Sequence, residues 1–200
     1  MGAVAAALTC LCVASTVAGE PAPDDGVYGR FDGDLDVGLG LGAELEPGRV
    51  RGAARLSAHY FYSIGAYASY RNAFCGEPAA RQLVSAGVDL RPVFIPRWVA
   101  NLQQGPRLLD LFVDSISLGI GASWQRPTGG AFGERHGLEA SLGFGLPLFA
   151  TAQGLWLETR GMIRWLEGAG NDDRETAPSL LLTLSWHELV LTPLAPDPES

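Results

Sequence analysis

Residues 27–46 read VYGRFDGDLDVGLGLGAELE, and they alternate with a period of two along the whole stretch. One register is apolar or Gly, from Val27 to Leu45, and the other is polar or Gly, from Tyr28 to Glu46. Successive side chains of an extended strand leave opposite faces, so this period predicts an amphipathic strand and not a helix. The Gly residues favour a strand as well, because they lower helix propensity.

Seven later segments repeat this alternation. They are residues 49–62, 64–74, 81–94, 108–124, 136–149, 155–166 and 179–191. Pro47-Gly48 predicts a turn after the first strand. Within 108–124 the apolar residues change from odd to even positions near Asp114, which predicts a β-bulge there. Residues 95–107 break the period, carry Pro at both ends and allow a short interfacial helix near 97–104.

The polar register combines small residues with charges of both signs. Its Gly and Ser residues are those expected where side chains must fit a narrow interior, whereas the other register is aliphatic. A soluble sandwich or barrel has the opposite arrangement, with an apolar inside. We therefore predict an all-β fold, a single closed antiparallel up-and-down barrel of about eight strands, with its apolar face outward.

Two sets of residues follow from this prediction. The first is an ion-pair network in the lumen, made of Arg30, Asp32, Asp34, Asp36, Arg55, Asp89, Arg91, Glu139, Glu158, Arg160 and Arg164. Within it, we expect the three Asp residues of the first strand to pair with Arg160 and Arg164 or with Arg51 and Arg55. The second set is interfacial aromatics, made of Tyr60, Tyr62, Tyr70, Trp98, Trp124 and Trp165. Trp156 departs from this second set, because its register points inward.

The amino-terminal residues predict export. An apolar run of small residues, 3–18, precedes a charged, Pro-rich segment, which is typical of a secretory signal peptide over residues 1–19. Residues 20–26 are then a periplasmic segment, 27–192 the transmembrane barrel and 193–200 a carboxyl-terminal tail. Removal of the signal segment would leave Cys75 as the one thiol, which cannot form an internal disulfide.

Composition and motifs argue against several other functions. Fourteen Arg against twenty-two acidic residues give a net charge of −8. This charge argues against binding to nucleic acid, whose phosphates require a basic surface. The three histidines, His59, His136 and His187, lack metal-ligand spacing, and the Asp residues at 32–36 are better explained by ion pairing than by calcium. The Gly alternation at 38–42 opens no helix and predicts no dinucleotide site. We expect no cofactor and no metal.

The pattern over residues 27–192 resembles the small eight-stranded outer-membrane proteins of Gram-negative bacteria, such as the OmpA transmembrane domain and OmpX. The resemblance is one of architecture. It implies a place in the cell outer membrane, contact with outer-membrane lipid and lipopolysaccharide, and a structural or surface-interaction role through extracellular loops, with an unknown surface partner. A lumen filled by side chains is not that of a general porin. The tail TPLAPDPES departs from these proteins, which usually end on an aromatic residue.

Two alternatives remain open. An outer-membrane enzyme acting on lipid or lipopolysaccharide would need a catalytic set, for which His187 with Glu188, or His136 with Glu139 and Ser141, are candidates. The His-x-Ser-Asn motif of the PagL lipid A deacylases is absent, so we expect no enzyme. A secreted or periplasmic lipocalin-like barrel would bind an apolar ligand.

Overall fold

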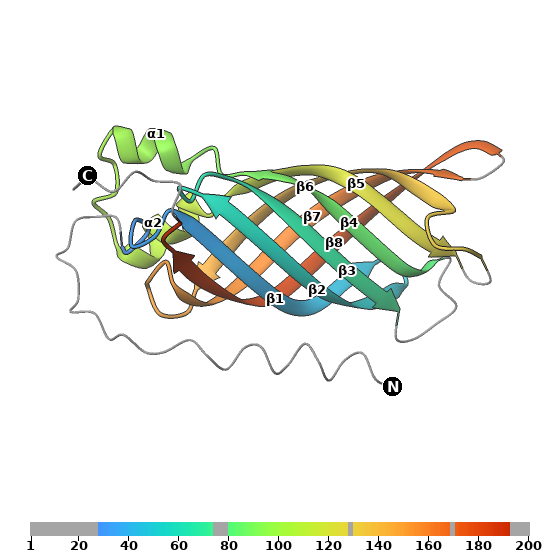
Figure 1. Ribbon diagram of the computed structural model, residues 1–200, viewed down its shortest axis with the longest axis horizontal. Coiled ribbons are helices and arrows are strands. Elements are labelled where there is room, and N and C mark those ends of the chain that lie inside the picture. The colour runs from blue at the N-terminus through green and yellow to red at the C-terminus, as the bar shows by residue number, and fades with distance from the viewer. Residues whose placement is uncertain (1–27, 74–79, 128–129, 169–170, 193–200) are drawn as a thin grey trace.

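The computed structural model describes residues 28–73, 80–127, 130–168 and 171–192, which form a closed barrel of eight strands. Each strand pairs antiparallel with the next along the chain, and β8 closes the barrel against β1 (Figure 1). The predicted fold class is therefore confirmed. The signal segment, residues 20–27, Cys75 and the tail lie outside the described residues.

Within that part of the chain the elements follow in this order: β1 (Leu35–Glu46), β2 (Arg49–Tyr60), β3 (Ile64–Ala73), β4 (Ala80–Leu90), α1 (Phe94–Val99), α2 (Arg107–Asp114), β5 (Ser117–Pro127), β6 (Arg135–Pro147), β7 (Gly154–Gly168) and β8 (Asn171–Val190). Pro47 and Gly48 alone connect β1 to β2, as expected, with Gly48 at a φ of 73°. We call the end of the barrel with α1 and α2 the helix end, and the opposite one the loop end.

The prediction that the first strand begins at residue 27 is wrong, because residues 28–34 form a turn at the helix end, before β1. Tyr28 and Gly29 have positive φ angles of 57° and 77°, and the Asp32 amide donates to the Gly29 carbonyl at 3.2 Å. Left-handed residues cannot continue a strand. Arg30, Asp32 and Asp34 therefore precede β1.

The predicted bulge near Asp114 is also wrong, because α2 and not a strand occupies residues 107–114. Asp110, Leu111 and Asp114 are buried on one side of α2, because Asp114 follows Leu111 by three residues and Asp110 by four, the spacings of one helix face. The change of register marks the junction between α2 and β5. The other helix, α1, overlaps the predicted one but begins and ends earlier, and neither helix in the described ranges is long and apolar enough to cross a membrane.

The last hairpin is longer than predicted. The alternation predicts strands over 155–166 and 179–191 and leaves the residues between them as a loop, but β7 reaches Gly168 and β8 begins at Asn171. Figure 1 shows this hairpin extending past the other strands at the loop end. Backbone pairing continues through Trp165 and Thr176. It depends on backbone hydrogen bonds, which polar residues form as readily as apolar ones, so a polar sequence does not exclude a strand.

Candidate functional site

The lumen at the loop-end half holds six buried charged residues, which we call the loop-side cluster: Glu44, Glu46, Arg51, Arg71, Glu139 and Arg164. Three carboxylates face three guanidinium groups, so the formal charges of the cluster cancel. None of these side chains is more than 8% exposed.

Strand register brings part of this cluster together, and the narrow lumen brings the rest. Glu44 and Arg51 are partners across the β1–β2 pair, and Nη1 of Arg51 lies 3.1 Å from Oε2 of Glu44. Arg164 on β7 reaches across to β1, where it donates to Glu44 and, at 2.7 Å, to Glu46. Buried charges are costly unless they are paired in this way.

A second link in the loop-side cluster crosses the barrel from β3 to β6. Arg71 donates to Glu139 through both terminal nitrogens, at 2.7 and 3.3 Å. Tyr67 and Ser85 also donate to Glu139, at 3.2 and 3.1 Å. This carboxylate therefore joins β3, β4 and β6 inside the lumen.

Nearer the helix end, a helix-side cluster contains Asp36, Arg55, His59, Asp89, Arg91, Glu158, Arg160 and His187. Asp89 accepts hydrogen bonds from Arg160 at 2.7 Å and from Arg55 at 3.2 Å. Asp36 accepts one from Arg91 at 2.9 Å, and its other oxygen lies 2.8 Å from Nδ1 of His187. Every acidic group of this cluster thus has a basic neighbour.

Inward Gly residues make room for the longest of these side chains. A Cβ placed on Gly143 would lie 2.9 Å from Cζ of Arg160, and one on Gly119 would lie 3.1 Å from its Nη1. Arg160 also donates to Ser117 and Ser141, at 2.8 and 3.0 Å. The small residues of the polar register therefore accommodate a buried guanidinium.

The predicted pairing of the three Asp residues is wrong in its partners. Asp32 is exposed on the turn before β1. Asp34 accepts hydrogen bonds from the backbone and side chain of Thr192, and the side-chain bond is the main reason its pKa is lowered. Only Asp36 reaches the lumen network, where it meets Arg91 and not Arg160. The positive φ angles at residues 28–29 explain why Asp32 and Asp34 lie outside β1, since they end the alternation that the prediction assumed.

Six residues of the two clusters were absent from the predicted network, although Arg51 was named as a possible partner of the three Asp residues. The six are Glu44, Glu46, Arg51, His59, Arg71 and His187. A signal for them exists, because all six occupy the inward register of strands that the alternation predicts. Register identifies a lumen residue, whereas its partner depends on how far neighbouring strands are shifted around the barrel.

The helix end is covered by a unit that we call the cap, made of the turn 28–34, α1 and α2 (Figure 1). Arg30 and Asp114 form its central ion pair, at 2.7 Å, with both side chains fully buried. Arg97 and Gln103 donate to the same carboxylate, at 3.0 and 2.7 Å. Burial raises the pKa of Asp114, and the neighbouring Arg30 and Arg97 oppose that shift.

Aromatic and aliphatic side chains fill the space between the cap and the lumen. The buried cluster there consists of Tyr62, Phe94, Leu111, Ala152, Trp156 and Leu189. Tyr62 is therefore not an interfacial aromatic as predicted. Its φ of 53° turns it inward after β2, and burial raises its pKa to about 12. Trp156 is buried as its register requires.

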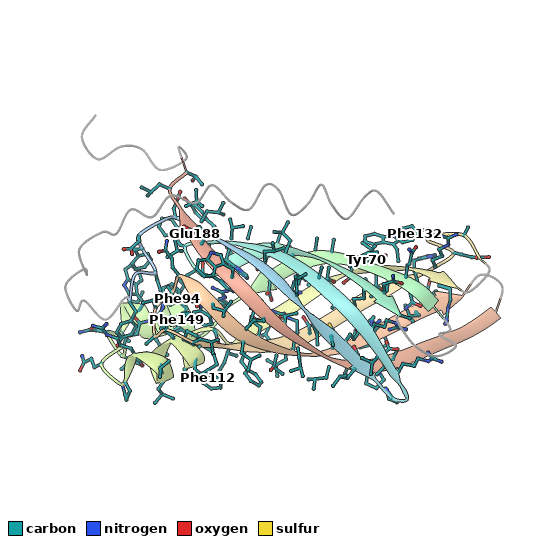
Figure 2. The ribbon with its side chains drawn as sticks, turned by 90° about the horizontal axis from the view of Figure 1, so that it is seen from below. Tyr70, Phe94, Phe112, Phe132, Phe149 and Glu188 are labelled. Carbon is teal, nitrogen blue, oxygen red and sulfur yellow. The ribbon has the colours of Figure 1, made fainter. Side chains whose placement is uncertain are left out.

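The other five predicted aromatics lie on the outer surface. Tyr60, Tyr70, Trp98, Trp124 and Trp165 are each 37–44% exposed. Figure 2 shows Tyr70 near the loop end, and Phe94, Phe112 and Phe149 near the helix end. The ring of Phe112 on α2 contacts that of Phe144 on β6, with centroids 5.5 Å apart. Aromatic side chains therefore lie at both ends of the barrel.

The barrel wall separates the members of both candidate catalytic sets. His187 is buried in the lumen, whereas Glu188 accepts a hydrogen bond from the exposed Trp186 on the outer face. His136 is exposed, whereas Glu139 and Ser141 are buried. Among the residues that the structure describes, no group of three or more His, Cys, Asp or Glu side chains is placed to hold a metal ion.

These features define a class: an eight-stranded up-and-down barrel with an ion-paired lumen and an apolar outer wall. No family model matches the chain, and no curated protein matches it. Among solved structures, the crystal structure of Neisserial surface protein A (NspA) matches with 14% sequence identity and a TM-score of 0.39. The match covers 76% of this chain and 94% of that one.

Proposed function

We propose that this protein is an integral outer-membrane barrel with a closed lumen, whose role is structural or is carried out through its loops at the cell surface. The observation that supports this most strongly is the reversed distribution of polarity. Charged side chains are buried inside, while large apolar side chains on all eight strands are exposed outside. In water this arrangement is unfavourable on both counts.

The apolar outer wall continues around the barrel. Each strand contributes large exposed apolar side chains, among them Leu41, Leu56, Ile64, Val88, Ile120, Leu142, Ile163 and Leu184. Leu41 is 64% exposed and Ile120 is 58% exposed. Soluble monomers rarely expose continuous apolar patches larger than about 300–600 Å². A lipid bilayer provides a solvent in which such a belt is favourable.

Backbone pairing also supports a bilayer. In lipid every backbone N–H and C=O must be satisfied within the protein, which a closed sheet achieves and an open sheet does not. The shortest strand has 10 residues, and a tilted strand needs about 9–11 to span the hydrocarbon.

The lumen does not suit a pore or a lipocalin-like binder. A void lined by Arg55, His59, Asp89, Arg91 and Arg160 measures about 10 Å³, which is about the room that one water needs. Diffusion pores need a wider barrel. An apolar ligand would meet guanidinium and carboxylate groups inside the lumen, which are costly to desolvate.

The proposed orientation places the cap in the periplasm and the loop end outside. The partners are then outer-membrane lipid and lipopolysaccharide along the wall, and an unknown surface partner at the loops. The alternative is an enzyme acting on lipopolysaccharide acyl chains. Mass spectrometry of lipid A from cells with and without the gene tests it, because a difference in the acyl chains would favour the enzyme.

Cell fractionation and gel mobility test the proposal. We expect the protein in the outer-membrane fraction, with a mobility that changes on boiling, and no large stable conductance in planar bilayers. A protein that is soluble without detergent and shows no mobility change would contradict membrane insertion. A large conductance would contradict the closed lumen alone.

A further inference from the structure

A hollow of about 480 Å³ lies in the barrel wall toward the loop end, between β5, β6 and β7. We call it the wall hollow. Its side chains include two indoles, an imidazole, a carboxylate and one leucine, namely Trp124, Trp165, His136, Glu167 and Leu138. Its volume is within the range of small-molecule sites, about 300–1,000 Å³.

Strand register places the polar and aromatic groups side by side. Trp124, His136 and Glu167 are consecutive partners across β5, β6 and β7. Leu138 and Trp165 are partners in the adjacent outward-facing row, two residues nearer the helix end. All five side chains are exposed, so they share the outer face. Ala122, which also lines the hollow and shares the outward register, carries only a methyl group and so leaves room beside the indoles.

The chemistry of the wall hollow is unlike that of the aliphatic middle of the wall. An imidazole and a carboxylate stand among aliphatic neighbours, next to two partly exposed indoles. A purely apolar ligand would cover the Glu167 carboxylate and the His136 imidazole without offering a hydrogen bond to either. A sugar ring fits both features, since its C–H face stacks on an indole while its hydroxyls hydrogen-bond to Glu167 and His136.

The position of the wall hollow indicates where that sugar comes from. Trp124 belongs to the same row of cross-strand partners as Tyr70, through Val84, and Figure 2 shows Tyr70 near the loop end. Interfacial aromatics lie at the level of lipid headgroups. The hollow lies at this headgroup level, directly beyond the apolar part of the wall. A lipid whose acyl chain lies along the wall would therefore have its headgroup at the hollow.

We propose that the wall hollow binds the sugar headgroup of a glycolipid in the outer leaflet. This proposal rests on the proposed function, because it requires insertion with the loop end outward. Indole faces and the Leu138 side chain hold the ring, and Glu167 and His136 select hydroxyl groups over a bare phosphate.

Fluorine NMR of protein labelled with 5-fluorotryptophan tests the site, because the five Trp residues report separately. Trp124 and Trp165 line the hollow, whereas Trp98 lies on α1, Trp156 is buried in the lumen and Trp186 is exposed on β8. Single Trp→Phe variants assign the signals. Refolded protein that shows the boiling shift is titrated with rough lipopolysaccharide and, separately, with phosphatidylglycerol.

We expect the Trp124 and Trp165 signals to move in a saturable way with lipopolysaccharide, while the Trp98, Trp156 and Trp186 signals stay in place. Glu167→Gln should raise the half-saturating concentration about tenfold, the loss of about one hydrogen bond to a charged group. Glu188→Gln is the matched control, because Glu188 lies beside an exposed Trp at the opposite end of the barrel, and it should change nothing.

Three results would overturn the site: no movement of the two signals, equal movement of the Trp186 signal, or equal movement with phosphatidylglycerol. Because only protein with the boiling shift is titrated, each of these results would leave membrane insertion intact. The failure of the wall hollow is thereby distinguished from the failure of the proposed function.

Discussion

The loop-side cluster and the cap both bury Arg–carboxylate pairs, but they hold them by different means. In the loop-side cluster every member is on a strand, so the closed sheet fixes its position. In the cap, Arg30 comes from a turn and Asp114 from α2, an element of eight residues. The same chemistry is therefore part of the barrel in one place and part of a lid in the other.

This difference indicates how each region should fail. Losing a partner in the loop-side cluster leaves a charge buried in the cooperative unit of the fold, whereas losing one in the cap releases a peripheral unit that can open locally. Global stability should depend on the first, and protection of the helix end should depend on the second.

The largest effect is expected for Arg164→Ala. This change removes one of the two guanidinium groups that reach both Glu44 and Glu46 and leaves Arg51 to pair with two buried carboxylates, so it should lower the free energy of unfolding by about 3–5 kcal/mol. Urea titration of protein refolded in phospholipid vesicles measures it. The control is Arg126→Ala, at an exposed residue that donates to the Gly130 carbonyl, where the change should stay within about 0.5 kcal/mol. Equal midpoints for the two variants would mean that the buried carboxylates are hydrated.

A local effect is expected for Arg30→Ala. Asp114 would lose its fully buried partner, and the cap should open more often. Trypsin cleavage after Arg97 or Arg107 should accelerate about tenfold or more, while the boiling shift of the barrel is retained. Arg126→Ala again provides the control. A loss of the boiling shift in Arg30→Ala would show instead that the cap and barrel unfold as one unit.

The smallest effect is expected for ion conductance. Opening the cap with Arg30→Ala exposes the helix-side cluster, but Asp89, Arg160 and their neighbours still fill the lumen. Planar-bilayer recordings should therefore remain as closed as those of the unmodified protein. Large stable openings in this variant would assign closure to the cap and not to the lumen network.

The sequence predicts the strand-borne region well because a period of two leaves a clear record of which face each side chain joins. Each of the eight predicted segments overlaps one observed strand, although 108–124 also includes most of α2 and 81–94 runs to the first residue of α1. The alternation also places Asp36, Arg55, Asp89, Glu139, Arg160 and Arg164 in the polar register. It does not identify their partners, since Arg160 meets Asp89 from β4 and Arg164 meets Glu44 from β1. Those contacts depend on barrel closure and strand shift, which no local pattern records.

Most of the cap was not predicted, because its segments alternate apolar and polar residues over a few positions, as a strand does. Leu109, Leu111 and Val113 alternate with polar or mixed neighbours, although Asp110 and Asp114 also lie four residues apart, as on one face of a helix. The turn at 28–34 continues the alternation of β1 in sequence, and only the left-handed angles of Tyr28 and Gly29 end it. A backbone conformation of that kind is decided by tertiary contacts such as the Arg30–Asp114 pair.

The central claim is that the apolar register faces lipid, and Leu142→Arg tests it most directly. Leu142 is near the middle of β6 and is 55% exposed. In a bilayer this change should lower the free energy of unfolding by about 2–4 kcal/mol, whereas Leu191→Arg, beyond the end of β8 at a side chain 77% exposed, should cost about 0–1 kcal/mol. Unfolding of both variants in phospholipid vesicles provides the measurement. Equal stability for the two, within about 0.5 kcal/mol of the unmodified protein, is the result for a wall that faces water, and it would contradict the membrane barrel.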